Sequence, residues 1–240
     1  MHMIDHHGIA SHIAANIITI LVRERDGLLP GSSIEERLDF FNNELDAYYG
    51  IRGVANRLPP LRYSNLLDDT GYPELHGKLV KAANTRSVIP FLLNLQRRAV
   101  DRDPTKTNRH ILKVADSLQS LYNIFYGAHD FHTIPEQELV LKHCNRLGKN
   151  YQILAVQAVA ARQKYWKQPV KLHYVVGHLP WQARLINPRK VQGYCSESMV
   201  GRMADIYGKS MCGPHHEKVQ NKFAIKYCTA LSIEWAMAEP

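Results

Sequence analysis

The chain has 240 residues, of which 45% are hydrophobic and 22% are charged. This length suffices for one large domain or two small ones, and the composition argues against long disordered spans. No stretch approaches the ~18 uninterrupted apolar residues that cross a membrane. The apolar stretch 9–22 is interrupted by polar residues and lacks the basic start and cleavage site of a signal peptide. We therefore expect no membrane partner.

The cysteines are too few and too widely spaced for a disulfide scaffold. There are four of them, Cys144, Cys195, Cys212 and Cys228. Their spacing favours a reducing compartment, so we expect an intracellular protein of the nucleus or the cytoplasm.

The net charge of +8 is distributed unevenly along the chain. Residues 1–150 carry 18 Lys and Arg against 17 Asp and Glu, a balance of +1, and residues 151–240 carry 12 against 5, a balance of +7. Such asymmetry is typical of a surface that faces a polyanion, above all nucleic acid. A basic, solvated face without any partner is the alternative.

Hydrophobic periodicity and capping signals predict a mostly helical chain. A first helix is expected over 9–25. Ser33-Ile34-Glu35-Glu36 has the pattern of a capping box that begins a second helix, which Gly50 is expected to end. Further along, we expect a loop at 53–71, helices over 74–83 and 88–100, and a polar break at 101–107.

The second half of the chain also has helical patterns. The apolar stripe between Ile111 and Phe125 predicts an amphipathic helix over 110–126. Thr133 is the expected cap of the next helix and Gly148 its end. Residues 172–176 are β-branched and aromatic, which fits a short strand or the start of a helix. The other expected helices span 151–166, 197–207 and 214–235.

Glu197 is the leading candidate for chemistry. It lies at the start of an expected helix, after a loop that contains glycine, where a carboxylate can ligate a divalent metal ion. Metal-dependent phosphoryl transfer needs at least two acids, and Asp205 lies about two turns further along the same face. The alternative is an acid that stabilises the first turn of a helix through the helix dipole.

His173 and His178 form a second candidate. Their five-residue spacing places them on opposite faces of a strand and poorly on one face of an α-helix. They are therefore a poor ligand pair unless the chain bends at Gly177. His173, close to Lys171, could instead contact a phosphate, and a packed, hydrogen-bonded ring is the remaining alternative.

A zinc site is a further possibility that we do not expect. Cys195, Cys212, His215 and His216 are the right ligand types, and Cys212 and His215 form one short hook. Standard zinc fingers pair two such hooks, whereas Cys195 stands alone. Packed free thiols are the alternative.

The doublet His129-Asp130 invites comparison with helical metal phosphohydrolases, which combine a His-Asp doublet with other His and Asp ligands. The other histidines considered with it are His6, His7 and His110. No clear partner motif follows the doublet. We expect it to lie in a loop ahead of the cap at Thr133.

Aromatic residues and cations alternate between 164 and 194, a pattern in which rings stack on bases and cations follow phosphates. The rings are Tyr165, Trp166, Tyr174, Trp181 and Tyr194, and the cations are Lys164, Lys167, Lys171, Arg184, Arg189 and Lys190. The alternative is that the rings lie in the core, which we expect at least for Tyr174 and Trp181.

Two segments resemble the transposase-like proteins of large eukaryotic DNA transposons, which have an RNase H-like core split by a helical insertion. The first, His2-Met3-Ile4-Asp5-His6-His7-Gly8-Ile9-Ala10-Ser11-His12 followed by Asn16, is similar to that group's Asp-x-x-His-x-x-Asp-Leu-Gly stretch. The second is similar to the group's closing segment, where a Lys-x-His strand precedes a helix with the last catalytic acid. It contains Lys171-x-His173, His178-Leu179, Asn187-Pro188-Arg189, Glu197 and the stretch 218–227.

The resemblance implies that Glu197 is the third acid of a catalytic triad and a ligand of Mg²⁺. The helices from Ser33 to Trp166 would be the insertion. The two earlier acids would lie outside this chain. The resemblance therefore implies a C-terminal piece that is inactive by itself, with Lys171, His173 and Arg202 near phosphate.

We therefore expect a mainly α fold. A helical domain would span 1–168, with an N-terminal core segment at 1–25, and a basic segment with a small α/β remnant of an RNase H-like core would span 169–240. The expected function is binding of nucleic acid, above all DNA, in a transposase-derived protein or fragment without turnover of its own. The expected contacts are Lys171, His173, Arg189, Lys190, Arg202, Lys218 and Lys222. The alternative is a helical interaction module whose basic C-terminal end docks on an acidic protein or RNA.

Overall fold

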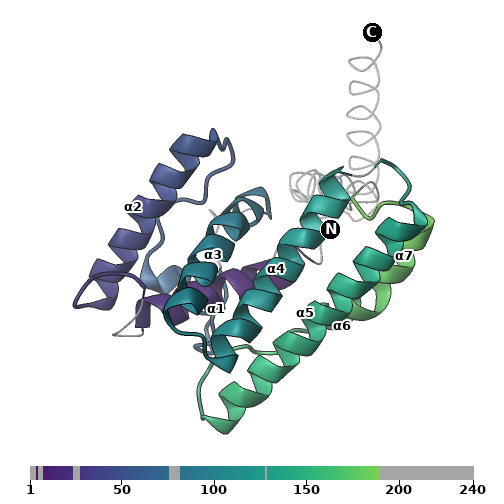
Figure 1. The fold of residues 1–240 in the computed structure, drawn as a ribbon. Coiled ribbons are helices and arrows are strands. Elements are labelled where there is room, and N and C mark those ends of the chain that lie inside the picture. The colour runs from purple at the N-terminus through teal and green to yellow at the C-terminus, as the bar shows by residue number, and fades with distance from the viewer. Residues whose placement is uncertain (1–3, 5–7, 24–27, 76–81, 128, 190–240) are drawn as a thin grey trace, which may run out of the picture. The chain divides into compact units, whose positions relative to one another are not determined.

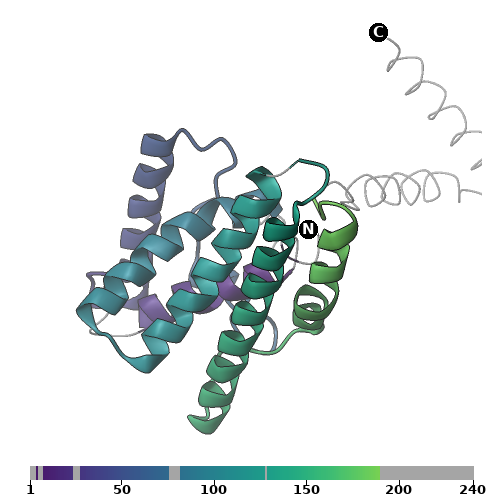
Figure 2. The same ribbon diagram turned by 45° about the vertical axis from the view of Figure 1, so that its right-hand side comes forward.

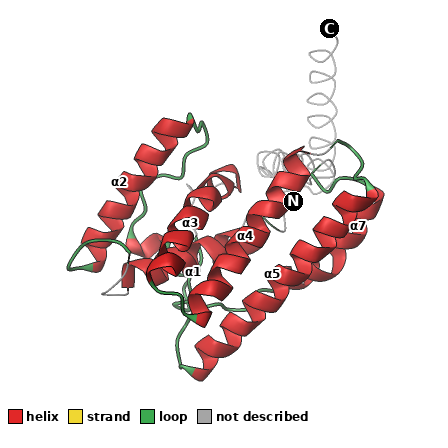
Figure 3. Cartoon of the chain, viewed as in Figure 1, coloured by secondary structure: helices red, strands yellow, loops and turns green. Residues whose placement is uncertain are grey.

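The computed structural model describes residues 4, 8–23, 28–75, 82–127 and 129–189. They belong to the first of two compact units, Met1–Val191; the second unit, Gln192–Pro240, lies outside the described residues. The described part is helical and has no strand, apart from one isolated antiparallel bridge between Leu67 and Pro73 (Figure 3). A mainly α fold is thus confirmed for this part. The α/β remnant was expected over 169–240, of which residues 190–240 lie outside the described ranges.

Five long helices make up most of the described part. They are α1 (Ile9–Arg23), α2 (Ile34–Arg52), α3 (Ala82–Arg102), α4 (Lys106–Gly127) and α5 (Ile134–Ala160). Helices α3, α4 and α5 lie side by side, with α2 on one flank and the last helical segment on the other (Figures 1 and 2). That last segment consists of α6 (Val170–His173), the π-helical turn η2 (Tyr174–His178) and α7 (Leu179–Leu185), and a short 3-10 turn, η1, spans Tyr63–Asn65.

Helix α1 is the centre of the core. It contacts α2, α3 and α4, and nearly all of its residues are buried. A helix buried on every side must satisfy its polar side chains internally. The Ser11 hydroxyl donates to the carbonyl of Gly8, and the Asn16 amide donates to the carbonyl of His12, both at 2.7 Å.

Helix α2 begins as predicted and ends later. The Ser33 hydroxyl accepts from the Glu36 amide at 3.1 Å, and the Glu36 carboxylate accepts from the N–H and the hydroxyl of Ser32, each at 2.7 Å. The predicted stop at Gly50 is wrong, because the helix continues to Arg52. Gly53 ends it with a φ of 61°, a left-handed conformation that favours glycine, and its N–H donates to the carbonyl of Gly50.

The helices predicted over 88–100 and 110–126 are confirmed as parts of α3 and α4, and the break between them lies within the predicted 101–107. The apolar stripe of α4 is buried, as its periodicity predicted. The helix predicted over 74–83 is wrong at Glu74 and Leu75, which are irregular; residues 76–81 lie outside the described ranges.

Helix α5 is one helix of 27 residues, so the predicted end at Gly148 and the separate helix over 151–166 are wrong. Its predicted start is confirmed, because the Glu136 carboxylate accepts from the N–H and the hydroxyl of Thr133 at 2.7 and 2.9 Å. A Cβ at Gly148 would lie 2.6 Å from Cγ2 of Val176 in η2. Gly148 therefore permits the close approach of two helical segments. Cys144, on the same helix, is a buried free thiol.

Residues 170–185 are helical, so the strand alternative for 172–176 is wrong. Lys171 and His173, which the resemblance places in a strand, lie in α6. Pro180 has no N–H, and its ring would clash with the carbonyl of Val176 in a continuous α-helix. The π turn, in which the Leu179 N–H bonds to the Tyr174 carbonyl, accommodates this proline. This segment packs on α5, so the first compact unit continues past residue 168.

Candidate nucleic-acid interface

The described residues include three of the predicted contacts and exclude the others. Lys171 and His173 lie in α6, and Arg189 follows α7. The predicted residues outside the described ranges are Glu197, Lys190, Arg202, Lys218, Lys222 and the set Cys195, Cys212, His215 and His216. The described part of the predicted interface is therefore the segment that precedes these residues.

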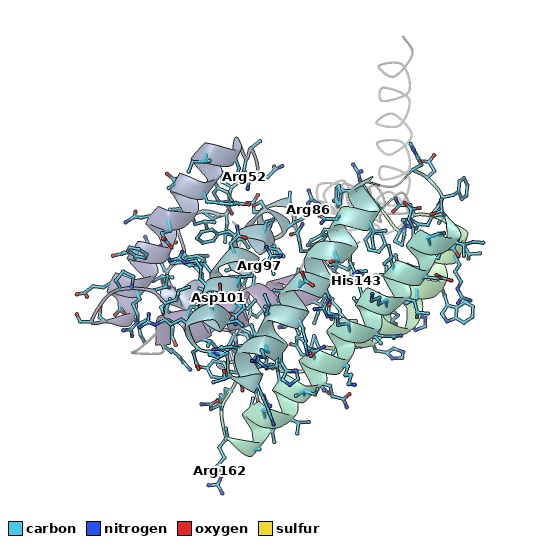
Figure 4. The ribbon with its side chains drawn as sticks, viewed as in Figure 1. Arg52, Arg86, Arg97, Asp101, His143 and Arg162 are labelled. Carbon is cyan, nitrogen blue, oxygen red and sulfur yellow. The ribbon has the colours of Figure 1, made fainter. Side chains whose placement is uncertain are left out.

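The chain contains a long run without acids. Residues 139–196 include ten Lys and Arg and not one Asp or Glu. The run occupies most of α5, the connection after it and all of 170–185; Arg162 lies just past the end of α5 (Figure 4). Among the described cations of the run, Arg146 pairs with Asp116 at 2.9 Å and Lys167 pairs with Asp68 at 3.0 Å. A search of the sequence for long stretches without Asp or Glu, in place of a count over 1–150 and 151–240, would have found this run.

The prediction that Tyr174 and Trp181 lie in the core is wrong. Their side chains are 43% and 64% exposed. The helical segment 170–185 instead turns Val175, Leu179 and Ala183 inward, and all three are buried. Both rings are therefore available to a ligand.

Arg184 is stacked on Trp181. The guanidinium carbon lies 4.5 Å from the centre of the indole ring, at a spacing of three residues along α7. Arg184 makes no ion pair with any described residue. An exposed ring and an exposed cation are thus presented together.

The two candidate histidines meet on the same surface. The rings of His173 and His178 have centres 5.1 Å apart, and Tyr174 lies 5.0 Å from His178. The bend that this pair required is supplied by the π turn that contains Gly177. We give the name outer face to five exposed side chains of this segment: His173, Tyr174, His178, Trp181 and Arg184.

Lys171 lies to one side of the outer face. It is only partly exposed, and its charge acts on the buried ring of His12 in α1. Burial lowers the pKa of His12; Glu74 opposes this, while Lys167 and Lys171 lower it further. Lys171 therefore extends the positive potential from the outer face toward α1.

Arg189 is engaged with α4. Its guanidinium carbon lies 4.2 Å from the centre of the Tyr126 ring, and Arg86 of α3 stacks on the same ring at 4.4 Å and hydrogen-bonds its hydroxyl (Figure 4 labels Arg86). The turn that carries it is fixed by Asn187, whose amide donates to the carbonyls of Phe125 and His129, each at 3.0 Å. The Asn-Pro-Arg motif thus closes the chain onto the end of α4.

The alternative metal site around His129-Asp130 gains no support from the geometry. The doublet lies in the loop between α4 and α5, and the ring of His110 is hydrogen-bonded to Asn150 Oδ1 at 2.7 Å. Across the described ranges, no three His, Cys, Asp or Glu side chains converge where a metal ion could bind.

Comparisons with protein-family models, with curated proteins and with solved structures found no match. In the part of the chain that the structure describes, no helix is long and apolar enough to span a membrane. The function of this chain therefore has to be inferred from its own residues.

Proposed function

We propose that this protein binds nucleic acid and that the outer face of residues 170–185 contacts it. The observation that carries the proposal is the exposed Trp181–Arg184 stack within a run of residues that has no acid. An exposed ring contributes about 1–3 kcal/mol when a base stacks on it, and nearby cations neutralise phosphates. Without a carboxylate in the run, no charge of its own repels the backbone of the nucleic acid.

The geometry favours single strands over duplexes. Trp181 and Tyr174 present ring surfaces, and only unpaired bases have faces free to stack on them. The outer face spans a short helical segment rather than a long recognition helix that could fill a major groove. We therefore expect single-stranded DNA to bind more tightly than duplex DNA of the same sequence.

The resemblance to transposase-like proteins extends the proposal. A protein derived from them would bind DNA without cleaving it, and Glu197 would supply one Mg²⁺ ligand of a set completed elsewhere. The support for this part is the sequence, since Glu197 and Arg202 lie outside the described residues.

The test is a titration of a labelled single strand with the purified chain, followed by fluorescence anisotropy at low and moderate salt, with and without Mg²⁺. Trp181→Ala should raise Kd roughly fivefold to a hundredfold, the equivalent of one stacked base. Ile51→Ala, which truncates another exposed apolar side chain on α2, should leave Kd unchanged. A chain that ignores every nucleic acid at low salt contradicts the function; binding that Trp181→Ala leaves unchanged contradicts the interface.

Arg184 provides a second test of the same surface. Arg184→Ala should weaken binding and reduce the slope of log K against log salt by about one unit, the contribution of one phosphate contact. Arg52, which stacks on Tyr48 of α2 at 5.9 Å, is a matched control, and Arg52→Ala should leave the slope unchanged. An equal loss in both variants would point to general charge rather than to this face.

A second function is favoured by two apolar side chains beside the outer face. Val170 and Leu185 are 78% and 76% exposed, which would suit an acidic amphipathic helix of a protein partner. Replacing both by Ser discriminates between the two functions. The change should abolish docking of such a helix and leave binding of single-stranded DNA within about twofold, because polar contacts and stacking carry the latter.

A further inference from the structure

The π turn gives His173 and His178 a relation that neither an α-helix nor a strand provides. In an α-helix, residues five apart point about 140° away from each other. The wider π turn, closed by the bond from the Leu179 N–H to the Tyr174 carbonyl, brings them to one side. Their rings are nearly perpendicular, with an angle of 81° between the planes.

The distance between the ring centres allows shared ligation of one ion. An imidazole nitrogen binds Zn²⁺ at about 2.0–2.1 Å, so the centre of a ligating ring lies about 3.2 Å from the metal. Two such rings at a tetrahedral angle have centres about 5.2 Å apart. The observed distance is 5.1 Å.

The ring nitrogens of His173 and His178 are accessible to a ligand. Neither makes a hydrogen bond or ion pair with a described residue, and both side chains are exposed. Gly177 lies between them without a side chain; a Cβ there would lie 3.6 Å from Cε1 and 3.9 Å from Nδ1 of His173. The glycine thus leaves the inner edge of the His173 ring uncovered.

We propose that His173 and His178 form a binding site for a divalent transition-metal ion. Neutral imidazoles suit Cu²⁺, Ni²⁺ and Zn²⁺, and a site of two nitrogens should follow the order in which Cu²⁺ binds most tightly. The hard ion Mg²⁺ prefers oxygen ligands, which this site lacks. Two protein ligands leave the other positions to water. Arg184, six residues beyond His178, weakens binding only modestly because salt screens exposed charges.

This site uses other residues than the Mg²⁺ site implied for Glu197 and does not require the proposed nucleic-acid binding. The test uses the full chain without an affinity tag, in the absence of nucleic acid, titrated with CuCl₂ and with ZnCl₂ by calorimetry. The variants His173→Asn and His178→Asn should each raise the Kd of this site at least about tenfold, and neither should shift the melting temperature, because both side chains are exposed.

Other histidines of the chain serve as controls. His6 and His7 are adjacent and could bind metal on their own. The double variant His6→Asn, His7→Asn should leave the Kd of the His173–His178 site unchanged. Pulsed electron paramagnetic resonance of the Cu²⁺ complex should detect two imidazoles in the unchanged chain and one in either single variant. Equal Cu²⁺ affinity in the chain and in the double variant His173→Asn, His178→Asn overturns the site. The nucleic-acid titration without Mg²⁺ can be run in the presence of a chelator, so its outcome does not depend on whether this metal site exists.

Discussion

Two tryptophans fifteen positions apart have opposite surroundings. Trp166 is 3% exposed; its backbone N–H donates to Asn16 Oδ1 at 2.7 Å, and its indole meets Tyr151 edge-on at 5.3 Å. Trp181 is 64% exposed and is in contact with the guanidinium of Arg184. The indole of Trp166 is buried within the fold, whereas the indole of Trp181 remains accessible to a ligand. We call residues 161–169 the anchored connection, in contrast to the outer face that follows it along the chain.

The anchored connection is fixed from three sides. The Tyr151 hydroxyl donates to the carbonyl of Lys167 at 2.7 Å, and Lys167 pairs with Asp68. Trp166 has a φ of 54°, which is costly for a residue other than glycine. The surrounding contacts offset that cost. The connection that leads to the outer face is therefore held by contacts with α1, α5 and the loop that contains Asp68.

Trp166→Ala should have the largest effect on the free energy of unfolding, because it removes the buried member of the two tryptophans. Removing a buried indole costs about 3–5 kcal/mol of the free energy of unfolding. Trp181→Ala should change it by less than about 0.5 kcal/mol, because the side chain is exposed. Urea denaturation followed by circular dichroism measures both. Equal losses would show that Trp181 is structural and would remove the basis of the proposed interface.

Asn16→Ala tests the anchor from the other side. The variant leaves the buried N–H of Trp166 without its acceptor, which should cost about 1–3 kcal/mol. Binding of single-stranded DNA by the folded fraction should be unchanged, because Asn16 is fully buried in α1. A loss of binding without loss of stability would contradict the separation of the two regions.

Gly148→Ala probes the contact that seats the π turn on α5. Alanine favours a helix more than glycine does, yet its Cβ would lie 2.6 Å from Val176. We expect a net loss of about 1–2 kcal/mol. Gly50→Ala is the matched control, since nothing lies within 4 Å of its Cβ in α2, and it should stabilise the protein by roughly 0.5–1 kcal/mol. Two stabilised variants would mean that α5 and η2 do not approach closely.

Asp68→Asn should have the smallest effect and depend on pH. Burial alone would raise the pKa of Asp68, but hydrogen bonds from Thr70, Lys167 and Tyr72 outweigh it, so the pKa lies below its usual range. A lowered pKa contributes stability above the unfolded value of about 3.9, and that stability is lost as the pH falls through the folded value. The variant should lose about 1 kcal/mol at pH 7 and progressively less below about pH 4. A loss of equal size at every pH would show that the charge is irrelevant.

The two helix starts marked by a capping box were predictable from the sequence, whereas the two helix ends assigned to a glycine were wrong. Ser33 and Thr133 cap their helices through local hydrogen bonds that a short motif specifies. Gly50 and Gly148 misled the prediction, because a glycine ends a helix only where its backbone turns left-handed, as at Gly53. Gly148 serves a contact with Val176, a residue distant in sequence, which no local pattern reveals.

The candidate site was predictable in its composition and not in its geometry. The sequence identified Lys171, His173 and Arg189 as candidates, but which rings are exposed depends on the face that packs on α5. For that reason Tyr174 and Trp181 were assigned to the core. The predictions for Glu197 and the basic residues after it remain predictions.

The π turn also sets the angular phase between the two ends of the segment. A π turn holds one residue more than an α turn, and each residue of an α-helix accounts for about 100° of rotation. A chain that lacked Gly177 would regain a continuous α register, provided that Pro180 were replaced as well, and His173 would then lie seven residues before Trp181, on the same side of the α-helix. One inserted codon, absorbed in a π turn next to a proline, thus leaves the flanking surfaces of a helix in their former register.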